Sequence, residues 1–565
     1  MNNLLRLKLP KPFAQPAAWH KVTALVLLML ALRIGYSLTM RFDTDEPQHL
    51  HVVWAWANGM LPYRDVFDNH APLFQWLYAP LFRLIGERAD IVIPMRWAVI
   101  PLFFVSMYYV FRAARTVFLP SSALWMAVFG CLLPPFFLKS VEFRPDDLWA
   151  ALWFCFLAVM VEGRASPKRA FVAGMLMGLA FAVSMKTTLF LLAVGLSITT
   201  LLLLKCFDRR VCIDKILLLR TGAAAGIGMI LIPALVVSYF WAQGALPNLW
   251  YCVIEHNIVP GMKRWGQPHF TDPWILMLFA FLLIGAVAIY RQDVPGGVRD
   301  RRVFLFLAPC FYLFVLYAFW PDITREDDLP LYPLLPLAGF ILLRSPASMG
   351  LRALHKRVIM MLPWLVVACQ LGWLLTIMHP WERANRTQMA KIARILKLTK
   401  PGSFVMDAKS GAIFRPRPFY YVLETVTRAR MRNNLIVDNI PERLIETKTT
   451  VADLRGLLNR STSRAFVADN YLPLAHSFDI RVAGKLLSSN STAAGEEIRF
   501  EVVVPTRYTI TDQHNRTPGL LDGIPLDQAR DLAPGEHWFR PYSASSQLAL
   551  VWAGAVEAGY LPEIR

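Results

Sequence analysis

Two acidic residues stand at the point where the first apolar run of the chain ends. Asp45 and Glu46 follow the apolar run over 20–40, and Pro47 comes next. A carboxylate at a membrane surface is costly unless it is solvated, paired or used in chemistry. Asp45 is therefore a candidate general base that deprotonates a hydroxyl group, or a candidate metal ligand. The alternative is that Asp43 to Glu46 only cap the N-terminus of a helix, where acidic residues are favoured.

Histidines and a further carboxylate follow in the same segment. His49 lies about one helical turn after Asp45, so both side chains are expected on one face, where they can share a divalent metal ion. Asp68 and His70 lie in Phe-Asp-Asn-His-Ala-Pro, which also fits an Asx turn before a proline. Because the sequence has no HExxH spacing, metal binding stays open at this point.

A second group of charged residues lies between later apolar runs. Asp146 and Asp147 begin a run, either as partners of the helix dipole or as a second acidic wall of the same site. Lys186 lies between two runs and Arg325 before another, where each either extends to water or binds an anionic lipid phosphate. The segment 242–273 offers cations and aromatic residues suited to a sugar or a phosphate, namely His256, Lys263, Arg264, Trp265 and His269.

The composition narrows the class of protein. The chain has 565 residues, 56% of them hydrophobic, and its mean hydropathy of +0.41 is typical of a membrane protein. The net charge of +19 does not indicate nucleic-acid binding, because Lys and Arg cluster between apolar runs, as they do in cytoplasmic loops. None of the seven Cys lies after Cys369 and no CxxC pair is present, so neither a disulfide framework nor a structural zinc site is expected.

Apolar runs predict roughly eleven transmembrane helices. Alternate connections carry clustered Lys and Arg and are expected in the cytoplasm, which places 41–90, 139–145, 186–187, 242–273 and 320–328 on the outer side. With an odd number of spans, the N-terminus is expected in the cytoplasm and the tail after His379 outside. The runs lie near 20–40, 91–111, 121–138, 146–162, 170–185, 188–205, 217–241, 274–290, 303–320, 329–344 and 358–379.

The first outer segment and the tail are both expected to be folded. Residues 43–59 predict a helix along the membrane interface, with Asp43 and Glu46 as a capping-box-like pair, and 72–82 predict a second interfacial helix. We therefore divide the chain into a transmembrane domain, 1–380, and an extracytoplasmic mixed α/β domain, 381–565. In the latter we expect helices over 385–398 and 420–431, and strands over 403–406, 464–468 and 499–504.

Four short motifs occur together over residues 20–345. They are Asp-Glu at 45–46, Phe-Asp-x-x-x-Pro at 67–72, Lys-Thr at 186–187 and Tyr-Pro at 332–333. This arrangement resembles the GT-C glycosyltransferases, and among them the protein O-mannosyltransferases and the lipid A aminoarabinose transferases. The resemblance implies a polyprenyl-phosphate-linked sugar donor and an inverting transfer, on the outer side of the membrane, to a hydroxyl of a lipid, glycan or protein acceptor.

The resemblance also implies roles for individual residues. Some would carry catalysis, some would form an acidic second wall, and some would contact the donor phosphate. The catalytic residues would be Asp45, Glu46 and Asp68, with Asp45 as general base. The second acidic wall would be Asp146 and Asp147, and the phosphate contacts would be Lys186, Arg325 and His70.

The resulting prediction is a mainly α-helical, multi-pass protein of the inner (plasma) membrane with a C-terminal soluble α/β domain. Its partners would be the lipid-linked sugar, the acceptor and membrane lipids, with no nucleic acid. Apart from the donor substrate, the only cofactor considered is a divalent metal ion at Asp45 and His49. The alternative function is a transporter or flippase for a lipid-linked or small anionic substrate. Transporters usually place charges within spans and show internal repeats, whereas here the charges lie in outer loops.

Overall fold

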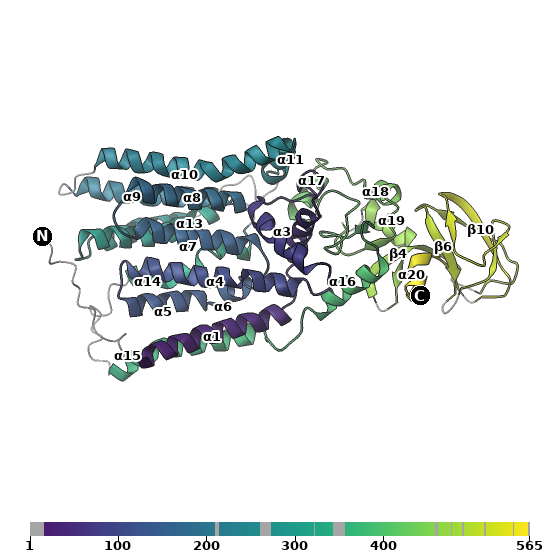
Figure 1. Ribbon diagram of the computed structural model, residues 1–565, viewed down its shortest axis with the longest axis horizontal. Coiled ribbons are helices and arrows are strands. Elements are labelled where there is room, and N and C mark those ends of the chain that lie inside the picture. Colours follow the sequence, from purple (N-terminus) through teal and green to yellow (C-terminus); the bar gives the residue numbers. More distant parts are fainter. Residues whose placement is uncertain are drawn as a thin grey trace.

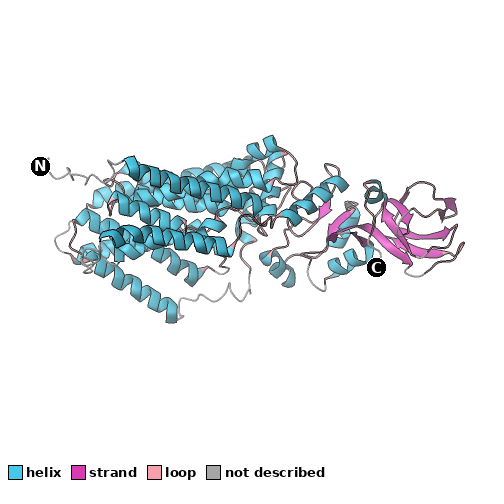
Figure 2. Cartoon of the chain, turned by 90° about the horizontal axis from the view of Figure 1, so that it is seen from below, coloured by secondary structure: helices cyan, strands magenta, loops and turns pink. Residues whose placement is uncertain are grey.

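A helical bundle and a mixed domain of helices and strands lie at opposite ends of the molecule (Figure 1). A view turned by 90° shows the strands gathered at the end away from the bundle (Figure 2). This computed structural model describes residues 16–208, 214–259, 273–320, 323–342, 356–457, 461–475, 477–488, 491–512, 516–545 and 547–562.

Each predicted apolar run coincides with a helix or a pair of helices in the bundle. Proline stands at the first turn of several of them, where its missing N–H costs no hydrogen bond. The helices are α1 (Pro16–Thr39), α4 (Val92–Arg115), α5 (Pro120–Cys131), α6 (Pro134–Lys139), α7 (Pro145–Val161), α8 (Pro167–Val183), α9 (Thr187–Phe207), α10 (Lys215–Ala242), α12 (Pro273–Tyr290), α13 (Gly296–Phe319), α14 (Leu335–Leu342) and α15 (Lys356–Ile377).

The expected count of eleven transmembrane helices is confirmed only in part. Six helices of the described residues are long and apolar enough to cross a membrane, namely α1, α4, α9, α10, α12 and α13. The predicted run 121–138 is broken at Pro134-Pro135 into α5 and α6, because proline cannot continue a helix without losing a hydrogen bond. Helices α7 and α8 are shorter, with 17 residues each.

Close packing in the bundle depends on small and aromatic residues. A Cβ on Gly174 of α8 would collide with the carbonyl of Ala225 on α10, and one on Gly228 of α10 with that of Phe171, so these two helices approach backbone to backbone. Elsewhere in the core, Phe190 of α9 stacks on Trp149 and on Trp153 of α7, with ring centroids 4.3 Å apart in each pair.

Two short helices cover the end of the bundle that faces the mixed domain. They are α2 (Glu46–Ala57) and α3 (Leu73–Ile85), as predicted from 43–59 and 72–82. Helix α3 leaves Trp76, Leu77 and Leu84 exposed, which suits a helix lying in the interface. Helix α2 differs from the prediction, because it is mostly buried and contacts the C-terminal domain through His51. The same end carries α11 (Leu246–Trp250) with η1 (Tyr251–Glu255), and η3 (Arg325–Asp328) with η4 (Tyr332–Leu334).

The C-terminal domain is built on two sheets. One has the strand order β1-β2-β4-β11-β6-β9 with β3 also paired to β4, and the other the order β5-β10-β7-β8. The strands are β1 (Val405–Met406), β2 (Val451–Asp453), β3 (Tyr471–Leu474), β4 (Ser477–Ser488), β5 (Ile498–Val502), β6 (Thr506–Thr511), β7 (Gly519–Leu521), β8 (Ile524–Pro525), β9 (Arg530–Leu532), β10 (Gly535–Pro541) and β11 (Leu548–Trp552); the helices are α16 (Arg386–Leu398), α17 (Thr425–Arg432), α18 (Ile440–Glu446), α19 (Thr462–Asn470) and α20 (Ala553–Glu557).

One secondary-structure prediction in this domain is wrong. The segment 464–468, expected to be a strand, lies within α19. Its short alternating pattern does not account for Ser461, whose side chain accepts a hydrogen bond from the N–H of Arg464 and so caps a helix. The predicted helix over 420–431 is shorter and begins at Thr425, whereas the strands over 403–406 and 499–504 and the helix over 385–398 are present.

The α8–α10 contact leads to a prediction about stability. Gly228→Ala adds a methyl group against a backbone carbonyl and should destabilise the protein by about 1–3 kcal/mol, seen as a lower melting temperature in detergent. Gly226→Ala is the matched control, because a Cβ there meets nothing within 4 Å and alanine favours the helix. Equal melting temperatures for the two variants would contradict the close contact.

Candidate active site

The site begins before α2, where the acidic residues of the first loop take different roles. Asp43 Oδ1 accepts a hydrogen bond from the N–H of Asp45 (3.1 Å), and the N–H of Asp43 donates to Oε2 of Glu46 (2.8 Å). Asp45 stands at the N-cap position of α2, but its carboxylate accepts no hydrogen bond from the described helix. Helix capping therefore does not explain the side chain of Asp45.

Glu46 connects the start of α2 to α4 through an ion pair with Arg96. Arg96 donates to both of its oxygens, with Nε 2.7 Å from Oε1 and Nη2 2.5 Å from Oε2, and the N–H of Phe143 also donates to Oε1 (2.8 Å). Both side chains of the ion pair are fully buried. A buried carboxylate whose two oxygens are occupied positions its neighbours; a direct part for Glu46 in catalysis stays a prediction.

Arg144, the residue before α7, joins carboxylates from separate segments. Its guanidinium lies 2.5 Å from Asp43 and 3.2 Å from Asp45. It also lies 3.4 Å from Asp146 and 2.5 Å from Glu326 of η3. Burial lowers the pKa of Arg144, but the surrounding carboxylates outweigh burial and raise the pKa well above its usual value. The guanidinium is thus the permanent positive centre of an acidic cluster.

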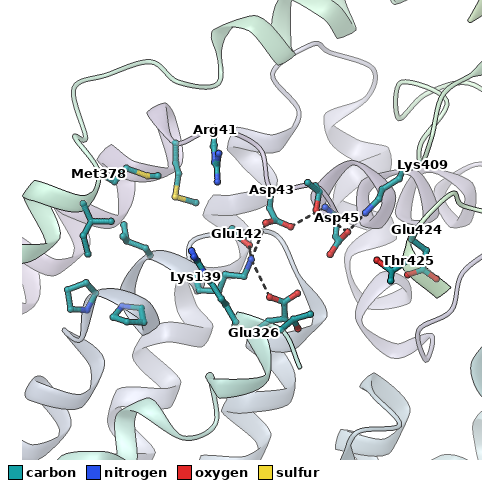
Figure 3. Close-up of a pocket in the computed structure, with 18 of the residues that line it drawn as sticks. Arg41, Asp43, Asp45, Lys139, Glu142, Glu326, Met378, Lys409, Glu424 and Thr425 are labelled. Atoms are coloured by element: carbon teal, nitrogen blue, oxygen red, sulfur yellow. Dashed lines mark hydrogen bonds and ion pairs between the residues drawn. The ribbon is translucent and has the colours of Figure 1, made fainter. Parts of the chain in front are cut away.

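Lys139, at the end of α6, is the second cation of this cluster (Figure 3). Its Nζ lies 3.1 Å from Asp43, 2.7 Å from Glu142 and 3.5 Å from Glu326. Burial raises the pKa of Glu142 to about 8, against the opposing charge of Lys139. This carboxyl group is therefore protonated at neutral pH and loses its proton in mild alkali.

Lys409 of the C-terminal domain completes the surroundings of Asp45. Its Nζ pairs with Oδ1 of Asp45, as Figure 3 shows, while Arg144 lies 3.2 Å from Oδ2. Burial raises the pKa of Asp45, but Arg144 and Lys409 outweigh burial and hold the pKa well below its usual range. Asp45 is therefore ionised, with both oxygens held by cations.

Lys186, between α8 and α9, is a further cation close to Asp146. Its Nζ pairs with Asp327 and is 3.8 Å from Asp146. Asp327 also holds η3, because its Oδ2 accepts a hydrogen bond from the N–H of Thr324 (2.8 Å). Asp147 is buried, and its Oδ2 has no hydrogen-bond partner within the described ranges.

Buried Asp68 and half-buried His70 form a separate pair. His70 Nδ1 lies 2.9 Å from Oδ1 of Asp68, and its ring packs on that of His49 with centroids 4.7 Å apart. His49 is fully buried, and neither ring nitrogen has a partner in the described part of the chain. Among the described residues, no group of three or more His, Cys, Asp or Glu side chains is arranged to hold a metal ion, and the metal at Asp45 and His49 stays a prediction.

A cavity of about 780 Å³ opens between the bundle and the C-terminal domain beside Asp45. Three of its cations, Arg41, Arg325 and Arg428, have no carboxylate partner among the described residues, and Arg428 donates instead to the carbonyls of Leu423 and Gly456. Lys139 and Lys409, in contrast, are paired with carboxylates. One wall is apolar and the opposite wall comes from the C-terminal domain. The lining residues include Met40, Pro134, Pro135, Leu138, Ile377 and Met378 on the apolar wall, and Leu423, Glu424, Thr425 and Arg428 opposite.

The sequence-predicted residues fall into two groups by position. Asp45 and Arg325 line the cavity, whereas Glu46, Asp68, His70, Asp146, Asp147 and Lys186 lie outside its lining. His256 is buried against Thr427, with Nε2 3.2 Å from its hydroxyl. The other candidates of the 242–273 segment, Lys263, Arg264, Trp265 and His269, lie outside the described residues.

Several residues of the cavity were missed by the sequence reasoning. Arg41 directly precedes the acidic loop, and Glu326 directly follows Arg325, so adjacency to predicted residues is a usable signal for both. Lys139 stands at the end of an apolar run, where a basic residue commonly flanks a transmembrane helix and attracts no attention. Lys409 is separated from Asp45 by 364 positions, in a domain to which no role could be assigned, and nothing local distinguishes it from other lysines.

Comparisons with known proteins give a family match and a shared fold. Residues 69–239 match a family described as dolichyl-phosphate-mannose-protein mannosyltransferase, and no functionally curated protein matches the chain. ArnT from Cupriavidus metallidurans in the apo state is 16% identical over 83% of this chain and 98% of its own, with a TM-score of 0.56. The same protein bound to undecaprenyl phosphate gives a TM-score of 0.52 with the same identity and coverage. Residues 69–239 are therefore similar to the mannosyltransferase family, and the chain shares the fold of ArnT.

Proposed function

We propose that this protein is an integral membrane glycosyltransferase that moves a sugar from a polyprenyl-phosphate-linked donor to a hydroxyl group of a lipid, glycan or protein acceptor. The observation that carries the proposal is the cavity in which an apolar wall, the cations Arg41 and Arg325, and the Asp45 carboxylate face one space. The mannosyltransferase match and the ArnT fold, known with undecaprenyl phosphate bound, support this reaction class.

The two sides of the cavity suit the two parts of such a donor. The prenyl chain is apolar and stays in the bilayer, so it requires an apolar approach such as that beside Met40, Leu138 and Ile377. The phosphate carries a negative charge, and guanidinium groups bind phosphate through two parallel hydrogen bonds. We assign this contact to Arg41 and Arg325, which line the cavity and would also stabilise the phosphate as it leaves.

Asp45 is the proposed general base. It accepts the proton of the acceptor hydroxyl, whose oxygen attacks the anomeric carbon while the bond from that carbon to the phosphate oxygen breaks. The phosphate departs with the bonding electrons, and attack from the opposite face inverts the anomeric carbon. The acidic cluster around Arg144 holds Asp45 in place for this step.

The remaining predicted residues surround this centre. We keep Asp146, which pairs with Arg144, and Asp147 as a second acidic group beside the cluster but outside the cavity lining, with Lys186 next to Asp146. Asp68 orients His70 through the hydrogen bond to Nδ1. We keep Lys186 and His70 as candidate contacts of the donor phosphate, which each reaches only after leaving its present carboxylate.

We place the reaction at the outer face of the inner membrane. In this orientation the N-terminus is cytoplasmic, and the end of the bundle with α2, α3 and the C-terminal domain is extracytoplasmic. The support is the clustering of Lys and Arg in the alternate connections at the other end of the bundle. Because the donor is lipid-linked, the site needs no nucleotide-binding fold.

Replacing the base tests the proposed function. Asp45→Asn keeps the shape of the side chain but not its basicity, and should lower kcat by roughly 10²–10⁴-fold. The assay follows undecaprenyl phosphate released from a panel of synthetic undecaprenyl-phosphate sugars by purified protein in detergent. Asp90→Asn, at a residue paired with Arg88 near the surface, is the control and should keep full activity. Transport of intact donor across liposome membranes, without release and equally fast in both variants, would refute the transferase.

Arg41 and Arg325 line the cavity without a carboxylate partner among the described residues, so replacing them should impair donor binding. Arg325→Ala and Arg41→Ala should each raise the KM for the donor by about tenfold, because each removes a charged contact to the phosphate. Arg64→Ala is the matched control, since Arg64 pairs with Asp65 on the surface of the same loop. A rise in KM equal to that of the control would exclude Arg41 and Arg325 from the phosphate site.

The raised pKa of Glu142 predicts an alkaline limit for donor binding. Below about pH 8 the carboxyl is neutral, and above it a negative charge appears in the cavity lining. The donor is a phosphodiester of constant charge, so its KM should rise roughly three- to tenfold as the pH passes through this value. Glu142→Gln should abolish the rise and exposed Glu446→Gln should not. A wild-type KM that stays flat between pH 7 and 9 would contradict a neutral Glu142.

A further inference from the structure

A loop of the C-terminal domain that is held by its own hydrogen bonds carries Lys409 at the candidate active site. The carboxylate of Asp407 accepts hydrogen bonds from the N–H groups of Lys409 (3.0 Å), Ser410 (2.6 Å) and Gly411 (2.8 Å) through Oδ1, and from that of Ala412 (3.0 Å) through Oδ2. One buried side chain thus fixes four successive N–H groups, and the position of the lysine backbone with them.

The same loop is tied to the membrane part of the chain. Ala412 and Ile413 have positive φ angles of 52° and 74°, a conformation that such residues adopt only under constraint. The carbonyl of Ile413 lies 2.9 Å from Nδ1 of His51 on α2, and Arg415 pairs with Glu87 after α3 (2.9 Å). The loop backbone is therefore anchored on the two helices that cover the site, and what remains adjustable is the long Lys409 side chain.

The ion pair between Lys409 and Asp45 is unfavourable for the proposed role of Asp45 as general base. With Lys409 on Oδ1 and Arg144 on Oδ2, Asp45 has a low proton affinity, and an incoming hydroxyl must compete with a cation at either oxygen. Arg144 is shared among several carboxylates and is nearly fully buried, so it cannot leave. Lys409 has this one ion pair in the described structure and lines the cavity, so its ammonium is the partner that can move.

We propose that Lys409 is a switch that exchanges Asp45 for the phosphate of the donor. In the empty protein its ammonium neutralises Asp45; when a polyprenyl-phosphate donor enters the cavity, the ammonium moves to the phosphate oxygens and frees Oδ1 of Asp45 to act as base. A flexible lysine, unlike a planar guanidinium, suits such a change of partner. The inference rests on the proposed function and gives the C-terminal domain a direct part in donor binding.

Equilibrium binding of undecaprenyl phosphate to the full-length protein in detergent tests the exchange without turnover. Lys409→Gln should weaken binding by about tenfold, because a phosphate contact is lost. Asp45→Asn should strengthen binding several-fold, because the ammonium no longer has to leave a carboxylate. In the double variant the gain from Asp45→Asn should disappear, since it depends on Lys409.

Two further variants separate the exchange from simple charge effects. Asp43→Asn removes a carboxylate that lines the same cavity but pairs with Lys139 and Arg144, so its effect should be the same with and without Lys409. Exposed Lys400→Gln should leave binding unchanged. A gain from Asp45→Asn that persists without Lys409, or undiminished binding by Lys409→Gln, overturns the switch alone. Absence of binding by the wild type overturns both the switch and the proposed function. Binding with the predicted coupling between Lys409 and Asp45, but without sugar transfer, overturns only the proposed function.

Discussion

The buried guanidinium of Arg144 is the interaction on which the rest of the site depends. Asp43, Asp45, Asp146 and Glu326 come from three separate segments of the chain, and without a permanent positive charge among them they would repel one another. Removing one partner from a buried ion cluster leaves uncompensated charge and is strongly destabilising. The loop before α2, the start of α7 and η3 are therefore held together by ion pairs to one guanidinium.

This arrangement explains why the site has two kinds of cation. Arg144 and Lys139 are bound to carboxylates and keep the acidic residues in position, whereas Arg41 and Arg325 face the cavity without such partners in the described structure. The first kind stabilises the protein, and the second is available to an anionic ligand. Lys409 belongs to both groups, because it pairs with Asp45 and also lines the cavity.

Local features were predictable from the sequence, and contacts between distant segments were not. Apolar runs, prolines and capping residues identified the bundle helices, α2 and α3, because those signals act within a few residues. The position of Asp45 at a polar cavity was also predictable, since an acidic residue at the end of an apolar run is costly unless it is solvated or paired. The pairing of Lys409 with Asp45 follows from how two domains dock, which no local pattern encodes. The strand predicted over 464–468 failed because a five-residue alternation is weaker evidence than the Ser461 cap beside it.

The core beneath the site bears on the choice between transferase and transporter. Asp146 is followed one turn later by Trp149 and a further turn later by Trp153, and Phe190 stacks on both at 4.3 Å. Tyr312 of α13 packs against Phe190 with centroids 5.2 Å apart, and all four side chains are buried. A polar headgroup that passed from the acidic cluster down between α7, α9 and α13 would have to displace this aromatic layer and lose its hydrogen bonds to water. Chemistry at the end of the bundle requires no such passage, so the packing of α7, α9 and α13 favours a reaction at the surface over transport through it.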